Sequence, residues 1–326
     1  MNKPFYIFLF VFILSLFQYT SSFAQTNLVY NGDFELYDSC PASLSSPSDL
    51  EINRCSGWYS PTDSGTSDYY NVCNNSMSHL AGVPSNFNGY QYAYSGNGYC
   101  GFFTYAIDGQ GRHYREYIQS KLIHKLEDGK LYDFSFFVAF INARYAVGKI
   151  GASFTDIAIH RFDYLPFTVV PQIVNTNGFI TDTVNWTKIE GTFIANGNEE
   201  YITIGNFEAP SSTDTLNLDP SIYAFGVYGD LSYYYIDGVK LIEKEIAFSN
   251  VFTPNGDGKN DYFTIEFPFT TVSIYNRWGQ KVFETKDNTN FWDGKTPNGE
   301  NASDGTYYYL ITIKEKTYKG FIQLLR

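Results

Sequence analysis

Residue types that many enzyme sites depend on are scarce in this chain. Its 326 residues include 4 histidines, 4 cysteines and 2 methionines, and only 17% are charged. The histidines lack metal-ligand spacing, and neither a Gly-x-Ser-x-Gly elbow nor a phosphate-binding loop is present. No pair of carboxylates is singled out for glycoside hydrolysis. We therefore expect a protein that is not an enzyme, with a glycan-active hydrolase as the less favoured alternative.

Basic residues are also few, with 22 Lys and Arg against 34 Asp and Glu. Residues 246–326 contain nine of each sign, so the preceding part carries 13 − 25 = −12, which is the entire net charge. An acidic domain repels a phosphate backbone, which excludes nucleic acid as the expected partner.

Long segments of helical periodicity are missing, whereas aromatic residues make up 19% of the chain. Short runs with period-2 alternation, bounded by Gly, Asn and Asp, predict an all-β protein. We expect strands at 89–94, 99–107, 115–122, 131–140, 150–159, 186–195, 200–207 and 233–242. Many short strands with this spacing are typical of a β-sandwich.

The N-terminus has the pattern of a signal peptide. Lys3 supplies a basic start, Phe5 to Phe17 is almost uninterrupted apolar, and Ser22 to Ala24 provides small residues before a cut. The apolar run is shorter than the ~20 residues that span a bilayer, and no second such segment follows. We therefore expect residues 1–24 to be removed and the mature chain to be exported without a transmembrane segment.

The four cysteines, Cys40, Cys55, Cys73 and Cys100, all lie in the acidic part. An even number in an exported protein predicts two disulfides, and spacing leaves three connectivities open. Of these we predict Cys40–Cys73 with Cys55–Cys100. Zinc is disfavoured because no Cys-x-x-Cys pair occurs.

The C-terminal segment carries a series of motifs in a fixed order. They are Phe252-Thr-Pro-Asn-Gly-Asp-Gly258, Tyr275-Asn-Arg-Trp-Gly279, Trp292-Asp-Gly294, Asp304-Gly-Thr-Tyr-Tyr-Tyr309 and Lys319-Gly-Phe-Ile322. Residues 248–326 thereby resemble the gliding-motility-associated C-terminal domain, the type B sorting domain of type IX secretion. The resemblance implies a small Ig-like β-sandwich, the type IX machinery as partner, and export across both membranes to the cell surface or the medium.

Candidate sorting residues fall into two groups. The first is a turn whose residues resemble a calcium loop, although Lys259 and Asn260 depart from that pattern and favour a hydrogen-bonded turn. The second is the positively charged C-terminal part of the domain, whose charge suits an acidic receptor surface. This group also includes Trp278, which we expect to pack in the small core. The candidates are Asn255, Asp257, Asp261, Arg277, Trp278, Gly279, Lys319 and Gly320.

Both ends of the region 25–244 suggest a second resemblance. Asn27-Leu-Val-Tyr-Asn-Gly-Asp-Phe-Glu35 and Tyr235-Ile-Asp-Gly-Val239 are similar to the first and last strands of jelly-roll, galactose-binding-like carbohydrate-binding modules. The resemblance implies a structural Ca²⁺ held by Glu35 and Asp237, since Ca²⁺ takes six to eight oxygen ligands. Gly238 replaces an acidic residue that is common in these modules, which removes one ligand.

Aromatic side chains near loops are candidates for ligand contact. Sugars stack on aromatic rings, and tyrosine hydroxyls supply hydrogen bonds. The candidate platform is Trp58, Tyr59, Tyr69, Tyr70, Tyr90, Tyr92 and Tyr94, although we expect most of these rings to fill the core. From this platform we select Trp58, Tyr59, Tyr69 and Tyr90 as the predicted ligand contacts. The jelly-roll resemblance and these aromatics predict a surface module that binds an extracellular glycan, with an adhesive, protein-binding surface module as the alternative.

Overall fold

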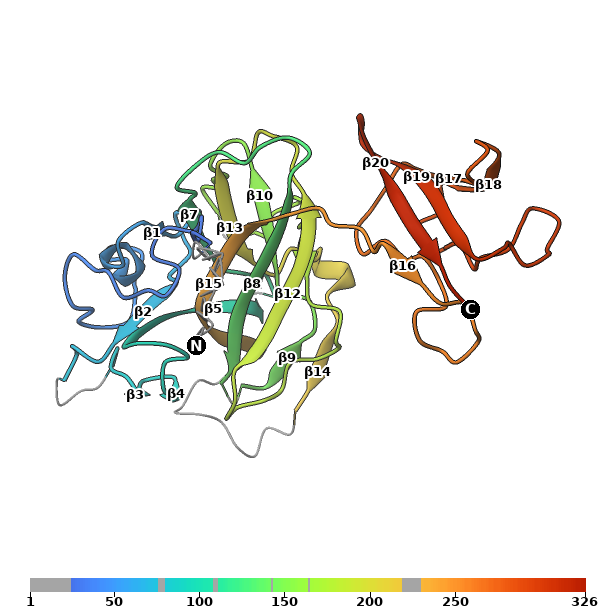
Figure 1. The fold of residues 1–326 in the computed structure, drawn as a ribbon. Coiled ribbons are helices and arrows are strands. Elements are labelled where there is room, and N and C mark those ends of the chain that lie inside the picture. Colours follow the sequence, from blue (N-terminus) through green and yellow to red (C-terminus); the bar gives the residue numbers. More distant parts are fainter. Residues whose placement is uncertain (1–24, 76–79, 108–110, 142, 164, 219–229) are drawn as a thin grey trace, which may run out of the picture.

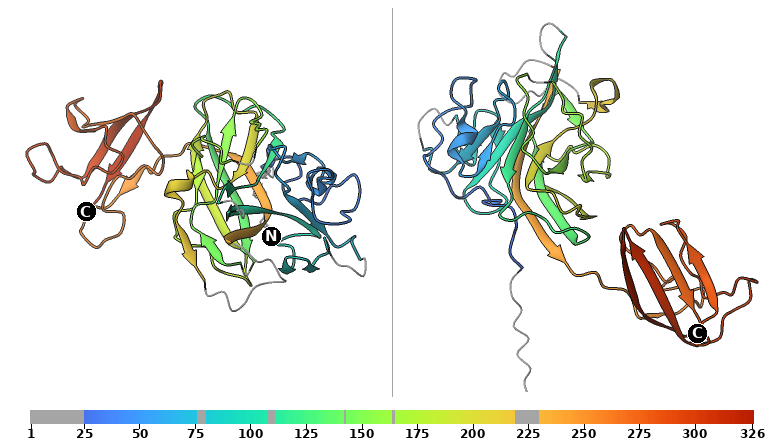
Figure 2. Two further views of the ribbon diagram at one scale, coloured as in Figure 1. Left: turned by 180° about the vertical axis from the view of Figure 1, so that it is seen from behind. Right: turned by 90° about the horizontal axis from the view of Figure 1, so that it is seen from above.

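The computed structural model describes residues 25–75, 80–107, 111–141, 143–163, 165–218 and 230–326 (Figure 1). These residues form two all-β units joined by one chain segment after Lys244, as both views in Figure 2 show. The predicted signal peptide lies outside the described residues. Among the residues described, no helix is long and apolar enough to cross a membrane.

Two antiparallel sheets build the first unit. One sheet contains, in spatial order, β1 (Trp58–Tyr59), β7 (Tyr117–Lys121), β13 (Tyr201–Gly205), β10 (Gly151–Thr155) and β11 (Ile173–Val174). The other contains β12 (Thr187–Ile194), β8 (Leu131–Phe140), β15 (Asp230–Lys244), β5 (Gly98–Ile107) and β2 (Asp68–Asn71), with β6 (His113–Tyr114) paired to β5. This arrangement confirms the predicted all-β, jelly-roll-like sandwich.

Alternation along the strands decides which side chains enter the core. On β8, Phe134, Phe136 and Val138 are buried, whereas Asp133, Ser135 and Phe137, which alternate with them, are partly exposed. Successive side chains of a strand point to opposite faces, so β8 presents one face to the core and the other outward.

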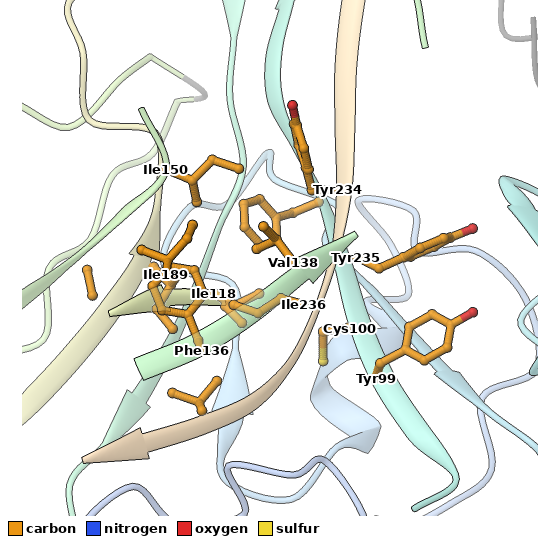
Figure 3. Packing of buried hydrophobic residues seen from close by; sticks show 14 of the residues in the cluster. Tyr99, Cys100, Ile118, Phe136, Val138, Ile150, Ile189, Tyr234, Tyr235 and Ile236 are labelled. Carbon is orange, nitrogen blue, oxygen red and sulfur yellow. The ribbon is translucent and has the colours of Figure 1, made fainter. Parts of the chain in front are cut away.

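Aromatic rings join the two sheets across the core. The ring of Phe154 on β10 lies 5.2 Å from Phe134 on β8 and 4.5 Å from Phe193 on β12, measured between centroids. Figure 3 shows the same packing further along, where Ile118 and Ile150 meet Phe136, Val138 and other residues of the second sheet. Burial of apolar surface on this scale is the main stabilising contribution to a sandwich.

A bulge in β15 creates the seat for the first segment of the chain. The strand register shifts between Asp237 and Lys240, and Gly238 has a φ of 63°. The Val239 N–H then donates to the Gly32 carbonyl at 2.7 Å. A Cβ at Gly32 would collide with the Val239 carbonyl, so glycine is required at this crossing.

Short elements complete the first unit at its ends and edges. They are the 3₁₀ helices η1 (Glu51–Arg54) and η2 (Pro210–Ser212) and the strands β3 (Ser85–Asn86), β4 (Gly89–Tyr90), β9 (Tyr145–Val147) and β14 (Thr215–Asn217). The predicted strand 89–94 is confined to β4. No described strand pairs with the residues that follow Tyr90, so the strand ends there.

The second unit contains one five-stranded sheet. In spatial order its strands are β16 (Val251–Phe252), β20 (Lys316–Leu324), β19 (Gly305–Ile313), β17 (Thr271–Tyr275) and β18 (Lys281–Thr285). Extended segments rather than a full second sheet cover its inner face, where Phe263 bridges to Trp292. Trp292 is fully buried, with its ring 4.8 Å from Tyr307 on β19.

The two units touch at the β19–β20 turn. Lys314 donates from Nζ to Asn196 Oδ1 at 2.7 Å and also to the Ala195 carbonyl. Leu131 and Ile194 of the first unit pack against the apolar core of the second. The contact therefore combines a hydrogen-bonded lysine with a small apolar seam.

Candidate functional site

One face of the six-stranded sheet carries a groove of about 810 Å³ across β12, β8 and β15. The antiparallel register places Glu190, Ser135 and Lys240 in one row across the three strands. Thr192 and Asp133 share the neighbouring row. These are the outward positions of the alternating strands, so the groove has a polar floor.

Charges of both signs line this groove in equal number. The bases are Lys188, Lys240 and Lys244, and the acids are Asp33, Asp133 and Glu190. Lys188 pairs with Glu190 at 2.6 Å and Lys244 pairs with Asp133 at 3.3 Å. A balanced floor suits a ligand without net charge.

Two stacked rings close one end of the groove. The rings of Tyr94 and Phe137 lie 3.6 Å apart and are nearly parallel, at 16°. Both line the groove, and Tyr94 is exposed. Gly238 lies beside them, where a Cβ would come within 3.0 Å of both rings. The result is a flat apolar surface next to the polar floor.

Further aromatic side chains continue from this stack. Tyr90 and Tyr92 are exposed, meet edge to face at 5.6 Å and share a 3.0 Å hydrogen bond between their hydroxyls. Trp186 donates from Nε1 to the Tyr92 carbonyl at 3.0 Å and meets the Tyr94 ring. The aromatic surface therefore extends along the 90–94 segment.

The four predicted ligand aromatics do not form one site. Trp58 is only 2% exposed, and its Nε1 donates to the Asn31 carbonyl at 2.9 Å. Tyr69 is fully buried and donates to the Phe34 carbonyl. The prediction is wrong for these two rings, because they fill the core. Tyr59 is half-buried at β1, where its hydroxyl accepts from Gln119. Tyr90 is exposed and contacts Tyr92, but it does not line the groove.

Sequence reasoning missed Phe137 and Trp186 as members of the site and left Tyr94 out of the ligand set. One signal was available for Phe137. It occupies an outward position on β8, where the other members of the alternation are Asp133 and Ser135. A large ring on a polar strand face indicates a contact surface rather than core.

The predicted calcium ligands both accept hydrogen bonds from one loop, at 94–98. Glu35 Oε1 accepts from the N–H groups of Asn97, at 2.6 Å, and Gly98, at 2.8 Å. Asp237 Oδ2 accepts from the Ser95 N–H at 3.0 Å. Burial raises the pKa of Asp237 to about 8, and the Glu35 charge adds to the effect.

The chemistry of this pair fits a cation in part. No ion pair in the described part of the chain includes Glu35 or Asp237, so neither is neutralised by a lysine or arginine. The described ranges contain no cluster of three or more His, Cys, Asp or Glu. Any bound Ca²⁺ therefore takes these two carboxylates plus backbone carbonyls or water, which supply hard oxygen ligands.

The cysteines agree with half of the predicted pairing. Cys40 and Cys73 form the predicted disulfide. Cys55 and Cys100 are free thiols in this structure, so the second predicted bridge is not formed in it. Both are buried and hydrogen-bonded to each other. Burial raises the pKa of Cys100, and the hydrogen bond with Cys55 adds a smaller increase.

The Asn255–Asp261 segment forms the expected hydrogen-bonded turn. Asp261 accepts from the N–H groups of Gly256, at 2.7 Å, and Gly258, at 2.8 Å. Asn255 Oδ1 accepts from the Asp257 N–H at 3.0 Å. These side chains therefore organise the backbone locally, as Asx turns do.

The remaining sorting candidates converge on a second groove. It has a volume of about 640 Å³ and lies on the outer face of β17, β19 and β20. Arg277, Gly279, Lys319 and Gly320 line it. Trp278 does not pack in the core as expected. It is 72% exposed, with the Arg277 guanidinium 5.3 Å from its ring centre, and Trp292 takes the core position instead.

Comparisons with solved structures return distant similarities that cover about two thirds of the chain. The xylan-binding CBM22-1 domain of Paenibacillus barcinonensis Xyn10C is 10% identical, with 64% of this chain and 99% of that chain covered and a TM-score of 0.30. The K3 cleaved adhesin domain of Lys-gingipain from Porphyromonas gingivalis W83 is 11% identical, with 67% of this chain and 98% of that chain covered and a TM-score of 0.30. The C-terminal family 22 carbohydrate-binding module of Clostridium thermocellum Xyn10B is 11% identical, with 66% of this chain and 96% of that chain covered and a TM-score of 0.29. At TM-scores of this size the similarity assigns no ligand to this chain.

No curated protein matches the sequence. The family model of the CHU_C Type IX secretion signal domain matches residues 246–324. The matched segment contains the whole five-stranded sheet and the motifs that follow one another from Phe252 to Ile322. Residues 246–324 therefore form a type IX secretion signal domain, which follows an all-β, jelly-roll-like domain.

Proposed function

We propose that the first domain binds an extracellular glycan without catalysis, at the groove of the six-stranded sheet. The secretion signal domain delivers it to the cell surface or the medium. The observation that carries the proposal is the Tyr94–Phe137 stack at the end of a charge-balanced polar groove.

Each part of the groove has a role in this proposal. The apolar face of a pyranose ring packs on the exposed face of Tyr94, as apolar ligand surfaces do on aromatic side chains. The ion-paired lysines and carboxylates of the floor meet the sugar hydroxyls. Exposed ion pairs contribute only ~0–1 kcal/mol to folding, so they can change partner when a ligand binds at little cost.

The groove carboxylates favour binding over hydrolysis. A glycosidase needs two carboxyl groups that flank the scissile bond, one to donate a proton and one to act as base or nucleophile. Asp133 and Glu190 are each partly exposed and paired with a lysine. We therefore propose that the domain is not a hydrolase.

The same domain is proposed to hold one structural Ca²⁺ between Glu35 and Asp237. Two carboxylates that face one loop and lack a basic partner support this. Bound Ca²⁺ would neutralise both groups and fix the loop that carries Tyr94.

A glycan array of neutral and acidic oligosaccharides tests the binding proposal, followed by calorimetry with the purified full chain. We expect neutral glycans to bind, and Tyr94→Ala to weaken binding roughly tenfold, as loss of a stacking aromatic does. Tyr262→Ala, at an exposed tyrosine of the signal domain, is the matched control. Absence of binding to any glycan at millimolar concentration rules the proposal out.

A protein-binding adhesive function is the second candidate. Ile157, Phe162 and Val170 are largely exposed on the 156–172 segment, away from the groove. Large apolar side chains left exposed to this extent are the feature that favours a protein contact. Binding that Phe162→Ser abolishes and Tyr94→Ala leaves intact would favour this function.

A further inference from the structure

The outer sheet face of the signal domain carries large apolar side chains that nothing in the described chain covers. Tyr308, Leu310 and Phe321 are 50%, 41% and 49% exposed and line the 640 Å³ groove. The register places Tyr308 between Tyr275 on β17 and Phe321 on β20, so three rings form one row across the sheet. Exposed apolar patches of this kind mark interaction sites on folded domains.

The two faces of β19 show that this exposure is not an extension of the core. Tyr307, Tyr309 and Ile311 point inward and are buried, whereas Tyr308 and Leu310 between them point outward. Outward positions of a solvated strand are usually polar. Leu310 and Phe321 therefore do not contribute to the domain's own core. An apolar side chain at these outward positions is explained by contact with another molecule.

Cations flank the apolar row. Arg277 lines the groove from the turn after β17, and Lys319 lies beside Leu310 in the register. Neither forms an ion pair with any residue that the structure describes, and no carboxylate lines the groove. The acid on the same sheet, Glu284, is engaged by Lys281 at 2.7 Å. The groove is thus locally cationic in a domain without net charge.

Two glycines lie at the edge of the groove. Gly320 pairs with the inward-pointing Tyr309, and a Cβ there would collide with the Tyr309 hydroxyl on the inner face of the sheet. Gly279 has a φ of 79°, a left-handed conformation that glycine adopts without strain. Residues separated by some forty positions in sequence therefore meet around one apolar, cationic surface.

We propose that this groove is the surface by which the folded signal domain is recognised, and that its occupant is a protein of the export apparatus. The partner surface would present apolar side chains ringed by Asp and Glu, because complementary charge steers association and excludes wrong partners. This inference rests on the secretion function of residues 246–324.

An export assay tests the proposal with the full chain, expressed in a bacterium that has a type IX secretion system. We expect the charge reversal Arg277→Glu/Lys319→Glu, and separately Tyr308→Ser/Phe321→Ser, to lower the exported fraction roughly tenfold, with folded protein left in the periplasm. The conservative Arg277→Lys/Lys319→Arg should export normally. The matched control is Lys286→Glu/Lys316→Glu, which changes the net charge equally at exposed positions outside the groove and outside the 255–261 turn.

Thermal unfolding of each purified variant separates a recognition defect from misfolding. A photo-crosslinking residue at position 321 reports contact with a partner directly, without weakening the groove. The same residue at position 262, in place of the exposed Tyr262, is the control. A cross-link to an export component only from position 321, at an acidic stretch of that component, supports the proposal. A cross-link to a second copy of this chain, or equal cross-linking from both positions, overturns it.

Deletion of residues 246–326 tests the secretion function of the domain separately from the recognition role of the groove. If the deletion leaves export unchanged, the secretion function of the domain itself is wrong. If the deletion abolishes export while both groove variants are exported like the parent chain, only the groove is wrong.

Discussion

Tyr233 Oη donates a 2.6 Å hydrogen bond to Asp68 Oδ2, and both side chains are buried in the first domain. Tyr70 donates to the same oxygen at 3.2 Å, and the Ser45 N–H donates to Oδ1 at 2.7 Å. Burial, with a smaller effect from the buried Glu116 carboxyl, raises the pKa of Asp68 to about 7. The folded protein therefore retains a proton here that the unfolded chain releases near pH 4.

The sign of the pH dependence follows from that difference. The stabilising contribution of protonated Asp68 is fully present below about pH 4 and is lost as the pH rises through about 7. We expect the free energy of unfolding to fall across this window, by at most about 1.4 kcal/mol per pH unit for one proton. Asp68→Asn should reduce the slope, as urea unfolding at a series of pH values will measure.

Two other groups contribute in the same direction. Burial also raises the pKa of Asp237, to about 8, and that of Glu116. Some slope should therefore remain in Asp68→Asn. An unchanged slope in Asp68→Asn would contradict the assignment.

Calcium should stabilise the first domain through Glu35 and Asp237. A ligand present at 100 times its Kd adds about 2.7 kcal/mol to the free energy of unfolding. We expect EDTA to lower the melting temperature of the parent chain and to have no effect on Asp237→Asn. Calorimetric titration provides the direct measurement, and equal melting with Ca²⁺ and with EDTA would rule the site out.

Cys55 and Cys100 should form a second disulfide in the exported protein. They are buried, hydrogen-bonded to each other and destined for an oxidising compartment. Peptide mapping without reduction should recover both Cys40–Cys73 and Cys55–Cys100. Cys55→Ser/Cys100→Ser should unfold at lower denaturant, since loss of a native disulfide typically costs ~2–5 kcal/mol. Free-thiol labelling of unreduced, unfolded protein at Cys55 would disprove the second bridge.

Trp58 should affect stability rather than ligand binding. Its ring lies 5.0 Å from Phe34 in the core. Trp58→Ala should lower the free energy of unfolding by about 3–5 kcal/mol, as large-to-small core substitutions do. Tyr90→Ala, at an exposed ring, should change it by less than about 0.5 kcal/mol. Similar effects of the two substitutions on urea unfolding would show that Trp58 is not a core residue.

Local pattern was sufficient for much of the fold. The alternation on β8, from Leu131 to Phe140, correctly identified an entire strand of the six-stranded sheet. The Asn255–Asp261 turn was equally readable, because its hydrogen bonds join residues at most five positions apart. Local chemistry fully determines such features.

Long-range relationships explain what was missed. Trp58 and Tyr69 are found near loops in the sequence, as exposed aromatics often are, yet both reach into the core because the segment after Phe34 folds over it. The neighbourhood of Arg277 and Lys319 depends on the pairing of β17 with β19 and of β19 with β20. That register is not encoded by any one segment.

The seam between the two domains has a consequence for the protein after delivery. Leu131 and Ile194 belong to the first domain but are covered by the signal domain, and Lys314 is hydrogen-bonded to Asn196 beside them. Proteolytic removal of residues after Lys244 would leave those two aliphatic side chains facing water. Cleavage would thus expose a new apolar patch on the released domain, which increased binding of a hydrophobic dye would detect. The patch would become available only when the protease has acted.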